Sequence, residues 1–142
     1  MTLVLDSSAT LAWVYADEVT PAIEQVFGRI AEAEAWVPAI WPTEVANALQ
    51  SGLRRRRIDA AFRDAALADL ALMPIVIDAD TNTYVWTTTT RLATRFGLTI
   101  YDALYLELAQ RRSLPLASLD RDLCTAARSL GVEVIGSPLR DE

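Results

Sequence analysis

The sequence contains no histidine and no lysine, so all 13 of its cationic side chains are arginines. Without histidine, Ser-His-Asp catalysis, Cys-His catalysis and a zinc site built on histidine are excluded. Without lysine, a P-loop ATPase lacks its phosphate-binding residue, and no glycine-rich phosphate motif is present. Any catalysis must therefore rest on carboxylates, hydroxyls, arginine or a metal ion.

Cysteine and long apolar runs are also scarce. Cys124 is the only cysteine, so no intrachain disulfide can form, and the cytoplasm is the default location. No apolar run approaches the roughly 18 residues that span a membrane. Residues 1–6 have no basic segment ahead of their apolar run, which predicts a first strand and not a signal peptide. We therefore expect no membrane association.

The chain has 142 residues, of which 52% are hydrophobic, and this length suits one domain with a substantial core. We expect the domain to cover residues 1–138 and a polar tail to cover residues 139–142. The net charge of −6 argues against broad electrostatic binding of nucleic acid. A local basic groove beside an acidic pocket is compatible with this charge.

Short runs rich in valine, isoleucine and leucine alternate with longer helical patterns. The expected strands are residues 3–5, 35–37, 75–77, 116–119 and 132–135, of which 35–37 is the weakest. This alternation predicts an α/β fold, in which an α/β/α sandwich encloses a central parallel sheet of about five strands. In such sheets, ligands bind beyond the carboxyl ends of the strands.

Helix starts are indicated by residues that favour caps and first turns: Ser7 or Ser8, Pro42, Asp59, Asp102 and Asp120. The helix that contains Pro42 is expected to run to about Arg56. Residues 80–96 are ambiguous, because four consecutive threonines at 87–90 favour a strand. We expect this segment to be mostly helical, since its later apolar residues recur at helical spacing and Gly97 fits a helix stop.

Four acidic residues stand where a charged side chain would approach the apolar side of the fold. Asp6 directly follows the first strand, while Glu44, Asp102 and Asp120 each lie at the start of an apolar stripe with helical spacing. Each acid alone is also explained as a helix cap or as a first-turn acid favoured by the helix dipole.

Taken together, the four acids predict a metal site. An unpaired buried charge costs several kcal/mol, and mutual proximity raises that cost unless a cation neutralises the carboxylates. Mg²⁺ takes oxygen ligands and keeps several waters. We therefore predict that Asp6, Glu44, Asp102 and Asp120 form one catalytic, Mg²⁺-binding pocket. There, the metal would activate water that hydrolyses a phosphodiester bond.

The segments that carry these acids resemble the PIN-domain family, in particular the VapC-type toxins of bacterial toxin–antitoxin pairs. They are VLDSS at 4–8, PTEVANAL at 42–49, GLTIYDALY at 97–105 and LASLDRDL at 116–123. The resemblance implies a PIN-like nuclease domain and an endoribonuclease that uses Mg²⁺, or Mn²⁺ as a substitute, to cut RNA. It also implies a homodimer and a cognate antitoxin that covers the active site. The family's acids map onto the same four residues, and Ser118 stands where members often have threonine.

Several further side chains are candidates for secondary roles. Asp122 is a possible fifth acid that we expect to face solvent or to act indirectly. Residues 54–57 are four consecutive arginines, which favour either a solvated helix end or a contact with the RNA backbone or antitoxin. Arg121 and Arg128 are alternative RNA contacts. The tryptophans are expected in the core or an interface, and Trp13 and Tyr15 are candidates for contact with a second copy or the antitoxin.

Two other functions compete with a ribonuclease. The first is a catalytically silent PIN-like binding module that acts through a protein partner. The second is a phosphorylated receiver domain, which also uses Mg²⁺ and acids at strand ends. The absence of lysine argues against the receiver, because its phosphorylation site normally uses one.

Overall fold

A computed structural model describes residues 2–137 of the chain. A five-stranded parallel sheet lies at its centre, with the strand order β3-β2-β1-β4-β5. The strands are β1 (Leu3–Leu5), β2 (Ala35–Val37), β3 (Ile75–Ile77), β4 (Leu116–Ala117) and β5 (Val134–Ile135). All five expected strands are present, although the last two are shorter than predicted. The expected tail at 139–142 lies outside the described residues.

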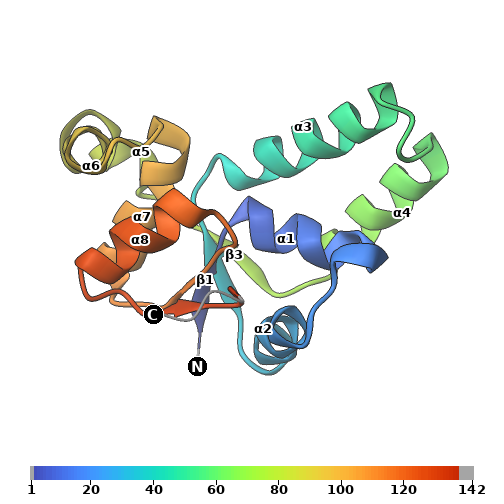
Figure 1. The fold of residues 1–142 in the computed structure, drawn as a ribbon, viewed down its shortest axis with the longest axis horizontal. Helices are drawn as coiled ribbons and strands as arrows, with labels where there is room; N and C mark the ends of the chain where they lie inside the picture. The colour runs from blue at the N-terminus through green and yellow to red at the C-terminus, as the bar shows by residue number, and fades with distance from the viewer. Residues whose placement is uncertain (1, 138–142) are drawn as a thin grey trace.

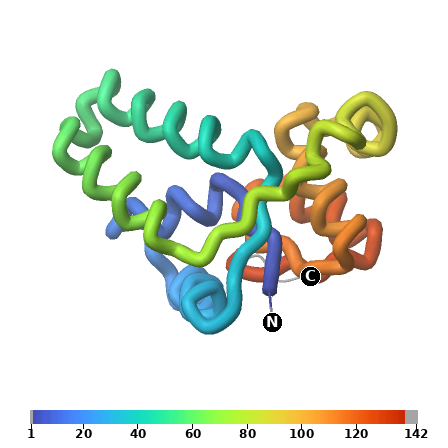
Figure 2. Tube along the Cα trace, turned by 180° about the vertical axis from the view of Figure 1, so that it is seen from behind, coloured from blue at the N-terminus to red at the C-terminus, as the bar shows by residue number. Residues whose placement is uncertain are grey.

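Helices cover both faces of the sheet, which confirms the predicted α/β/α sandwich. They are α1 (Ser7–Val14), α2 (Pro21–Glu32), α3 (Trp41–Arg54), α4 (Ala60–Ala71), α5 (Thr81–Tyr84), α6 (Thr90–Phe96), α7 (Ile100–Arg112) and α8 (Arg121–Ser129), with short turns η1 (Ala16–Glu18) and η2 (Val85–Thr89). In Figure 1, α1 and α2 lie on one side of the sheet, and α7 and α8 on the other. Seen from behind, α3 and α4 form a hairpin that projects away from the sheet (Figure 2).

The core is centred on β1 and α7. All three residues of β1 are fully buried, because strands flank it on both sides and helices cover both faces. In α7, every residue from Ala103 to Ala109 is buried. The helix is therefore packed on all sides, which places its first turn firmly beside the carboxyl end of β1.

Among residues 2–137, none of the helices has the length and apolar character that a membrane span requires.

The ambiguous segment 80–96 is helical, as predicted. It consists of α5, the π-helical turn η2 and α6, and it ends at Gly97 with a left-handed φ of 65°. The hydroxyls of Thr87 and Thr90 bond to carbonyls of the preceding turn, a contact that helical backbone allows, whereas the buried Thr89 hydroxyl has no hydrogen-bond partner among the described residues. The Thr90 hydroxyl, for example, donates to the Val85 carbonyl at 2.6 Å.

Two predicted helix starts are wrong. Ser7 and Ser8 lie inside α1, and Asp6 occupies the N-cap position, because the serine hydroxyls bond to the Asp6 carboxylate instead. Asp102 does not begin α7. Thr99 caps that helix, and its hydroxyl accepts a hydrogen bond from the Asp102 backbone N–H at 3.2 Å. The simple explanation of Asp102 as a cap therefore fails.

The other predicted starts are confirmed. Asp59 and Asp120 cap α4 and α8 through their side chains, and Pro42 lies in the first turn of α3. That helix ends at Arg54 and not at about Arg56, which has a positive φ of 58°. A residue in the left-handed region cannot continue a right-handed helix.

Candidate metal-binding site

Asp6 is held at the carboxyl end of β1, in the centre of the sheet. Its side chain is only 2% exposed. The hydroxyls of Ser8 and Ser118 both donate to its Oδ2 at 2.7 Å, and the Ser7 hydroxyl donates to Oδ1 at 3.3 Å. Three hydroxyls therefore fix the orientation of a buried carboxylate that is paired with no arginine in any described contact.

Ser118 also connects Asp6 to Asp120. Its hydroxyl oxygen accepts a hydrogen bond from the Asp120 backbone N–H at 3.1 Å while its proton points to Asp6. The Ser8 hydroxyl accepts from the Leu119 backbone N–H at 2.9 Å in the same way. The end of β1 and the segment after β4 are thus joined through two serines.

Glu44 lies in the first turn of α3 and is half-buried. The phenol of Tyr105, on α7, donates a hydrogen bond of 2.6 Å to Glu44 Oε1. Burial raises the pKa of Glu44, opposed by the Tyr105 hydrogen bond and assisted by the negative charge of Asp6. Burial and the charge of Asp6 likewise raise the pKa of Tyr105, so the phenol stays a proton donor.

Asp102 and Asp120 are supplied by the first turns of α7 and α8. Asp102 is the third residue of α7 and is half-buried. Asp120 uses Oδ1 to accept a hydrogen bond from the Leu123 backbone N–H at 2.8 Å. Its capping role therefore engages one carboxylate oxygen and leaves the other outside this bond.

The four carboxylates act on one another electrostatically. Burial raises the pKa of Asp102 to about 6, and the negative charges of Asp120, Asp6 and Glu44 add to this effect. Burial also raises the pKa of Asp6, again with a contribution from Asp120. The structure therefore brings all four predicted residues into one electrostatic neighbourhood, where a cation would relieve the repulsion.

The residues present fit a hard divalent ion. Their donor atoms are carboxylate oxygens, which suit Mg²⁺ or Mn²⁺ and not a soft metal. Within residues 2–137, no three acidic or cysteine side chains are grouped closely enough to enclose an ion as they stand. Mg²⁺ does not require such a group, because this ion usually binds through one or two carboxylates and keeps several waters.

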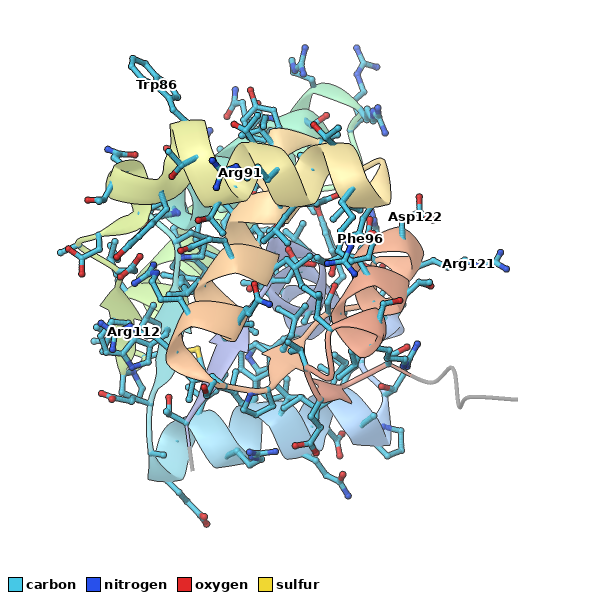
Figure 3. All side chains as sticks on the ribbon, turned by 90° about the vertical axis from the view of Figure 1, so that its left-hand side faces the viewer. Trp86, Arg91, Phe96, Arg112, Arg121 and Asp122 are labelled. Carbon is cyan, nitrogen blue, oxygen red and sulfur yellow. The ribbon has the colours of Figure 1, made fainter. Side chains whose placement is uncertain are left out.

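Two of the three secondary candidates on α8 extend into solvent, while Arg128, near the other end of the helix, is partly buried. Arg121 and Asp122 are both exposed, and both side chains extend from the protein at the start of α8 (Figure 3). The expectation that Asp122 faces solvent is therefore confirmed.

The four consecutive arginines lie at the far end of α3 from Glu44. Ten residues of helix separate Glu44 from Arg54, which corresponds to about 15 Å. All four arginines are exposed. Arg57 contacts the acids of η1, with 3.5 Å to Asp17 and 3.4 Å to Glu18, and its guanidinium lies 3.7 Å from the centre of the Tyr15 ring. Arg57 therefore makes intramolecular contacts at the surface.

The tryptophans occupy very different environments. Trp41 is buried, and its indole N–H donates to the Thr10 hydroxyl at 3.0 Å. Trp36 is partly buried, and the Arg112 guanidinium lies 3.6 Å from its ring centre. Trp86, in contrast, is 93% exposed on η2 (Figure 3). A core position is thus confirmed for Trp41, whereas Trp86 is not in the core, and its place in an interface stays a prediction.

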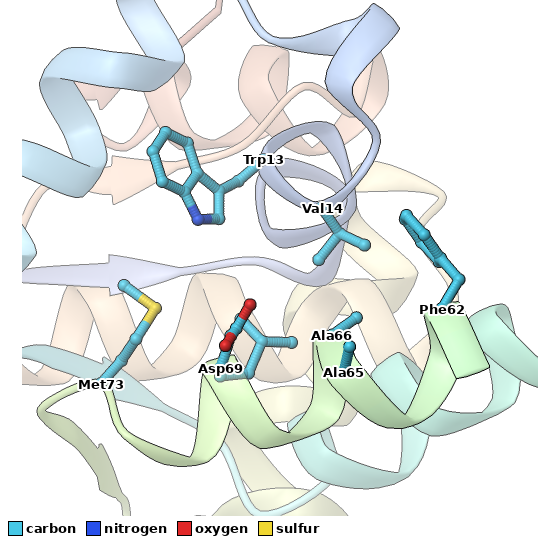
Figure 4. A pocket seen from close by; sticks show the side chains of 8 residues that line it. Trp13, Val14, Phe62, Ala65, Ala66, Asp69 and Met73 are labelled. Atoms are coloured by element: carbon cyan, nitrogen blue, oxygen red, sulfur yellow. The ribbon is translucent and has the colours of Figure 1, made fainter. Parts of the chain in front are cut away.

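Trp13 borders an apolar hollow of about 520 Å³ between α1 and α4 (Figure 4). Trp13 is 40% exposed and stacks on Phe27, with ring centres 4.7 Å apart. Tyr15 is buried instead, which removes it as a direct partner contact. The residues around the hollow include none of the four acids, so the hollow is separate from the candidate metal site.

Two contributors to the site went unrecognised in the sequence. Tyr105 and Ser8 each form a hydrogen bond to one of the four acids, but the sequence pattern indicated no role for Tyr105 and only that of a helix cap for Ser8. A signal for Tyr105 does exist, because residues three apart share one face of a helix and Tyr105 follows Asp102 at that spacing. For Ser8, the cap expectation concealed its contact with Asp6.

Comparison with known proteins places these features in context. Residues 3–129 match the family model described as the PIN domain. The structure of PAE2754 from Pyrobaculum aerophilum is similar, with a TM-score of 0.69, 23% identity, and coverage of 94% of this chain and 83% of that chain. The structure of VapBC2 from Rickettsia felis, bound to a DNA fragment from the VapBC2 promoter, is also similar. It has a TM-score of 0.62 and 14% identity, and the match covers 94% of this chain and 97% of that chain. No curated protein matches. At these identities, the two structures demonstrate a shared fold.

Proposed function

Because the chain belongs to the PIN-domain family, whose members are generally nucleases, we propose that it is a Mg²⁺-dependent endoribonuclease and the toxin of a toxin–antitoxin pair. The observation that carries this proposal is the electrostatic coupling of four carboxylates beyond the carboxyl ends of β1 and β4. Parallel α/β sheets bind their ligands at that edge.

Each acid has a distinct place in the proposed chemistry. Asp6 and Asp102 are the main metal ligands. Serine hydroxyls fix the orientation of the Asp6 carboxylate, and the negative charges of the three other acids raise the pKa of Asp102. Asp120 contributes Oδ2, the carboxylate oxygen that does not take part in the helix cap, either to the same ion or to a second one. When bound, Mg²⁺ would polarise a phosphoryl oxygen and lower the pKa of a coordinated water.

Glu44 is suited to deprotonate the attacking water. Its pKa is raised above the ordinary value for glutamate, which makes the carboxylate a better proton acceptor. Tyr105 engages Oε1, and the Ser7 side chain also acts on this carboxyl and lowers its pKa. Oε2, the oxygen outside the Tyr105 bond, is the atom that would contact the metal or accept the proton from water. The N-termini of α1, α3, α7 and α8 meet around this site, and their positive dipole ends favour a phosphate group.

The family and the structural similarity support the proposed partners. The VapBC2 structure contains a DNA fragment from the VapBC2 promoter, and its fold matches 94% of the length of this chain. On that basis, the proposal includes a cognate antitoxin protein, a homodimer of this chain, RNA as the substrate and the cytoplasm as the location.

The test compares RNA cleavage by the wild type with cleavage by Asp6→Asn and Asp102→Asn, with and without Mg²⁺ or Mn²⁺. Asp122→Asn is the matched control, because it removes an exposed acid from the same part of the fold. We expect metal-dependent cleavage by the wild type and the control, and none by the two site variants. Mapping RNA ends after brief expression, against Asp6→Asn, would identify the target.

Retained cleavage in both site variants would overturn the assignment of the acids. A titration with Mn²⁺ separates the remaining alternative. If the folded wild type showed no saturable Mn²⁺ binding and cut no RNA, the protein would be a silent binding module and not a nuclease.

A further inference from the structure

Tyr105 connects two helices that carry predicted metal ligands. It lies three residues after Asp102 on α7, and its side chain is fully buried. Its hydroxyl donates to Glu44 Oε1 on α3 at 2.6 Å. Because residues three apart share one helix face, this bond attaches the Glu44 carboxylate to the same face of α7 that carries Asp102.

Packing alone does not account for the tyrosine. A phenylalanine would fill nearly the same volume without placing a polar atom in the interior, where a hydroxyl needs a partner. That partner is an acidic group, and hydrogen bonds to ionised acceptors are about twice as strong as those between neutral groups. The hydroxyl thus belongs to the polar site and not to the apolar core.

The bond restricts a side chain that is otherwise mobile. A glutamate loses up to about 2 kcal/mol of rotamer freedom when its side chain is fixed, and Glu44 is only half-buried. A carboxylate that already occupies one rotamer loses less freedom when it binds a ligand. With Oε1 bound to Tyr105, the orientation of Oε2 is fixed as well.

The type of donor matters, as two other acids of this protein show. Asp78 and Glu107 are buried and pair with arginines, both with Arg111 and Asp78 also with Arg112, so cations offset their charge. Glu44 has a neutral phenol instead. A neutral donor orients the carboxylate and leaves its negative charge for a cation.

We propose that Tyr105 is a positioning residue that presents Glu44 Oε2 to the divalent metal and thereby sets the metal affinity of the pocket. The inference rests on the proposed function, but it concerns a residue outside the four acids. Partners that orient metal ligands typically contribute 10- to 100-fold to affinity or activity.

The experiment measures Mn²⁺ binding by calorimetry and steady-state RNA cleavage for Tyr105→Phe. We expect the Mn²⁺ dissociation constant to rise about 10-fold or more, with a lower kcat and an unchanged KM for RNA. Tyr101→Phe is the matched control, because it removes a phenol that is 57% exposed on the same helix. Its Mn²⁺ dissociation constant should equal that of the wild type.

A double-mutant cycle with Glu44→Gln distinguishes positioning from a general structural role. If Tyr105 acts through Glu44, Tyr105→Phe weakens Mn²⁺ binding in the wild type and has no further effect in the Glu44→Gln background. Equal weakening in both backgrounds would overturn the inference, as would a dissociation constant for Tyr105→Phe within twofold of the wild type.

A second variant covers the case in which Tyr105→Phe does not fold. Glu44→Asp keeps the negative charge but withdraws the carboxylate from Tyr105 by one methylene, and we expect it to weaken Mn²⁺ binding as Glu44→Gln does. Wild-type affinity in Glu44→Asp would contradict the inference while leaving the proposed nuclease intact. Failure of the wild type to bind Mn²⁺ would overturn both.

Discussion

The guanidinium of Arg111 donates hydrogen bonds to both carboxylate oxygens of Asp78, at 2.6 Å to Oδ2 and 3.3 Å to Oδ1. Asp78 follows β3 and has 1% of its side chain exposed, while Arg111 lies in the last turn of α7. This pair fastens the end of β3 to the helix that carries Asp102. Arg111 also binds Glu107 at 2.6 Å, so it pairs with two buried acids, while Arg112 lies farther from Asp78, with its Nε 4.0 Å from Oδ1.

Replacing Arg111 by methionine should destabilise the protein by about 3 kcal/mol, because it leaves buried Glu107 without its cation and Asp78 with only the longer contact to Arg112. Urea denaturation, followed by circular dichroism, would measure the loss. Arg63→Met is the matched control. Its partner, Asp64, is 68% exposed, so its loss should stay below about 1 kcal/mol. An Arg111→Met variant as stable as this control would contradict the prediction.

The same pair predicts a dependence of stability on pH. Burial alone would raise the pKa of Asp78, but the hydrogen bonds from Arg111 and Thr81 outweigh burial and lower it below 3.8. A carboxyl group with a lowered pKa stabilises the fold above its unfolded value, and this contribution is lost as the pH falls through the folded value.

The difference in unfolding free energy between the wild type and Asp78→Asn should therefore be constant from about pH 7 to pH 5. It should shrink as the pH falls below about 4. Urea denaturation of both proteins at each pH measures this difference directly. A difference that grew under acidic conditions would show that Asp78 is not stabilised as a carboxylate.

Asp102 should have the opposite effect in metal-free protein. Its pKa is raised to about 6 by burial and by the other three acids. The stabilisation from its protonated form is present below about 4 and is lost as the pH rises through about 6. Without divalent ions, Asp102→Asn should therefore melt a few degrees above the wild type at pH 7, because screening at a half-exposed site keeps the effect modest.

Thermal unfolding in EDTA between pH 5 and pH 8 would test this prediction. The advantage of Asp102→Asn should disappear toward pH 5, and added Mg²⁺ should raise the melting temperature of the wild type more than that of the variant. Asp122→Asn, which changes an exposed acid, should show neither effect. A wild type that melted above Asp102→Asn in EDTA at pH 7 would contradict the prediction.

Two tryptophans with contrasting burial should respond differently to removal. Trp41→Ala should cost about 3–5 kcal/mol, because it leaves a cavity and frees the Thr10 hydroxyl from the indole. Trp86→Ala should change the unfolding free energy of the monomer by less than about 0.5 kcal/mol, since the side chain is almost fully exposed. Chemical denaturation at low protein concentration would measure both.

The fold could be predicted because local patterns and packing agree in most of the chain. Runs such as Leu3–Leu5 and Ile75–Ile77 become strands, and alternation with helices fixes a parallel sheet. The wrong prediction of the α1 cap arose because a serine hydroxyl can bond either to the backbone at a helix start or to a neighbouring side chain. Ser7 and Ser8 are good caps by residue type, but the Asp6 carboxylate is a closer partner for both hydroxyls.

The site was predictable in its acids and not in the hydrogen bonds that orient them. The stripes that begin at Glu44, Asp102 and Asp120 indicate which faces are buried, and the strand end locates Asp6. The bond from Tyr105 to Glu44 joins residues 61 positions apart, and no local pattern specifies such a contact. Likewise, the exposure of Trp86 depends on how η2 packs against α7, which residue type alone does not reveal.

The hydrogen bond from Ser118 to Asp6 joins residues 112 positions apart, and this separation has a consequence during synthesis. Proteins are made from the N-terminus at about 5–20 residues per second. Asp6 therefore emerges from the ribosome early, but Ser118 and Asp120 emerge only when most of the chain has been translated. The four acids can therefore come together only after β4 has formed beside β1, so an unfinished chain does not contain the assembled candidate metal site.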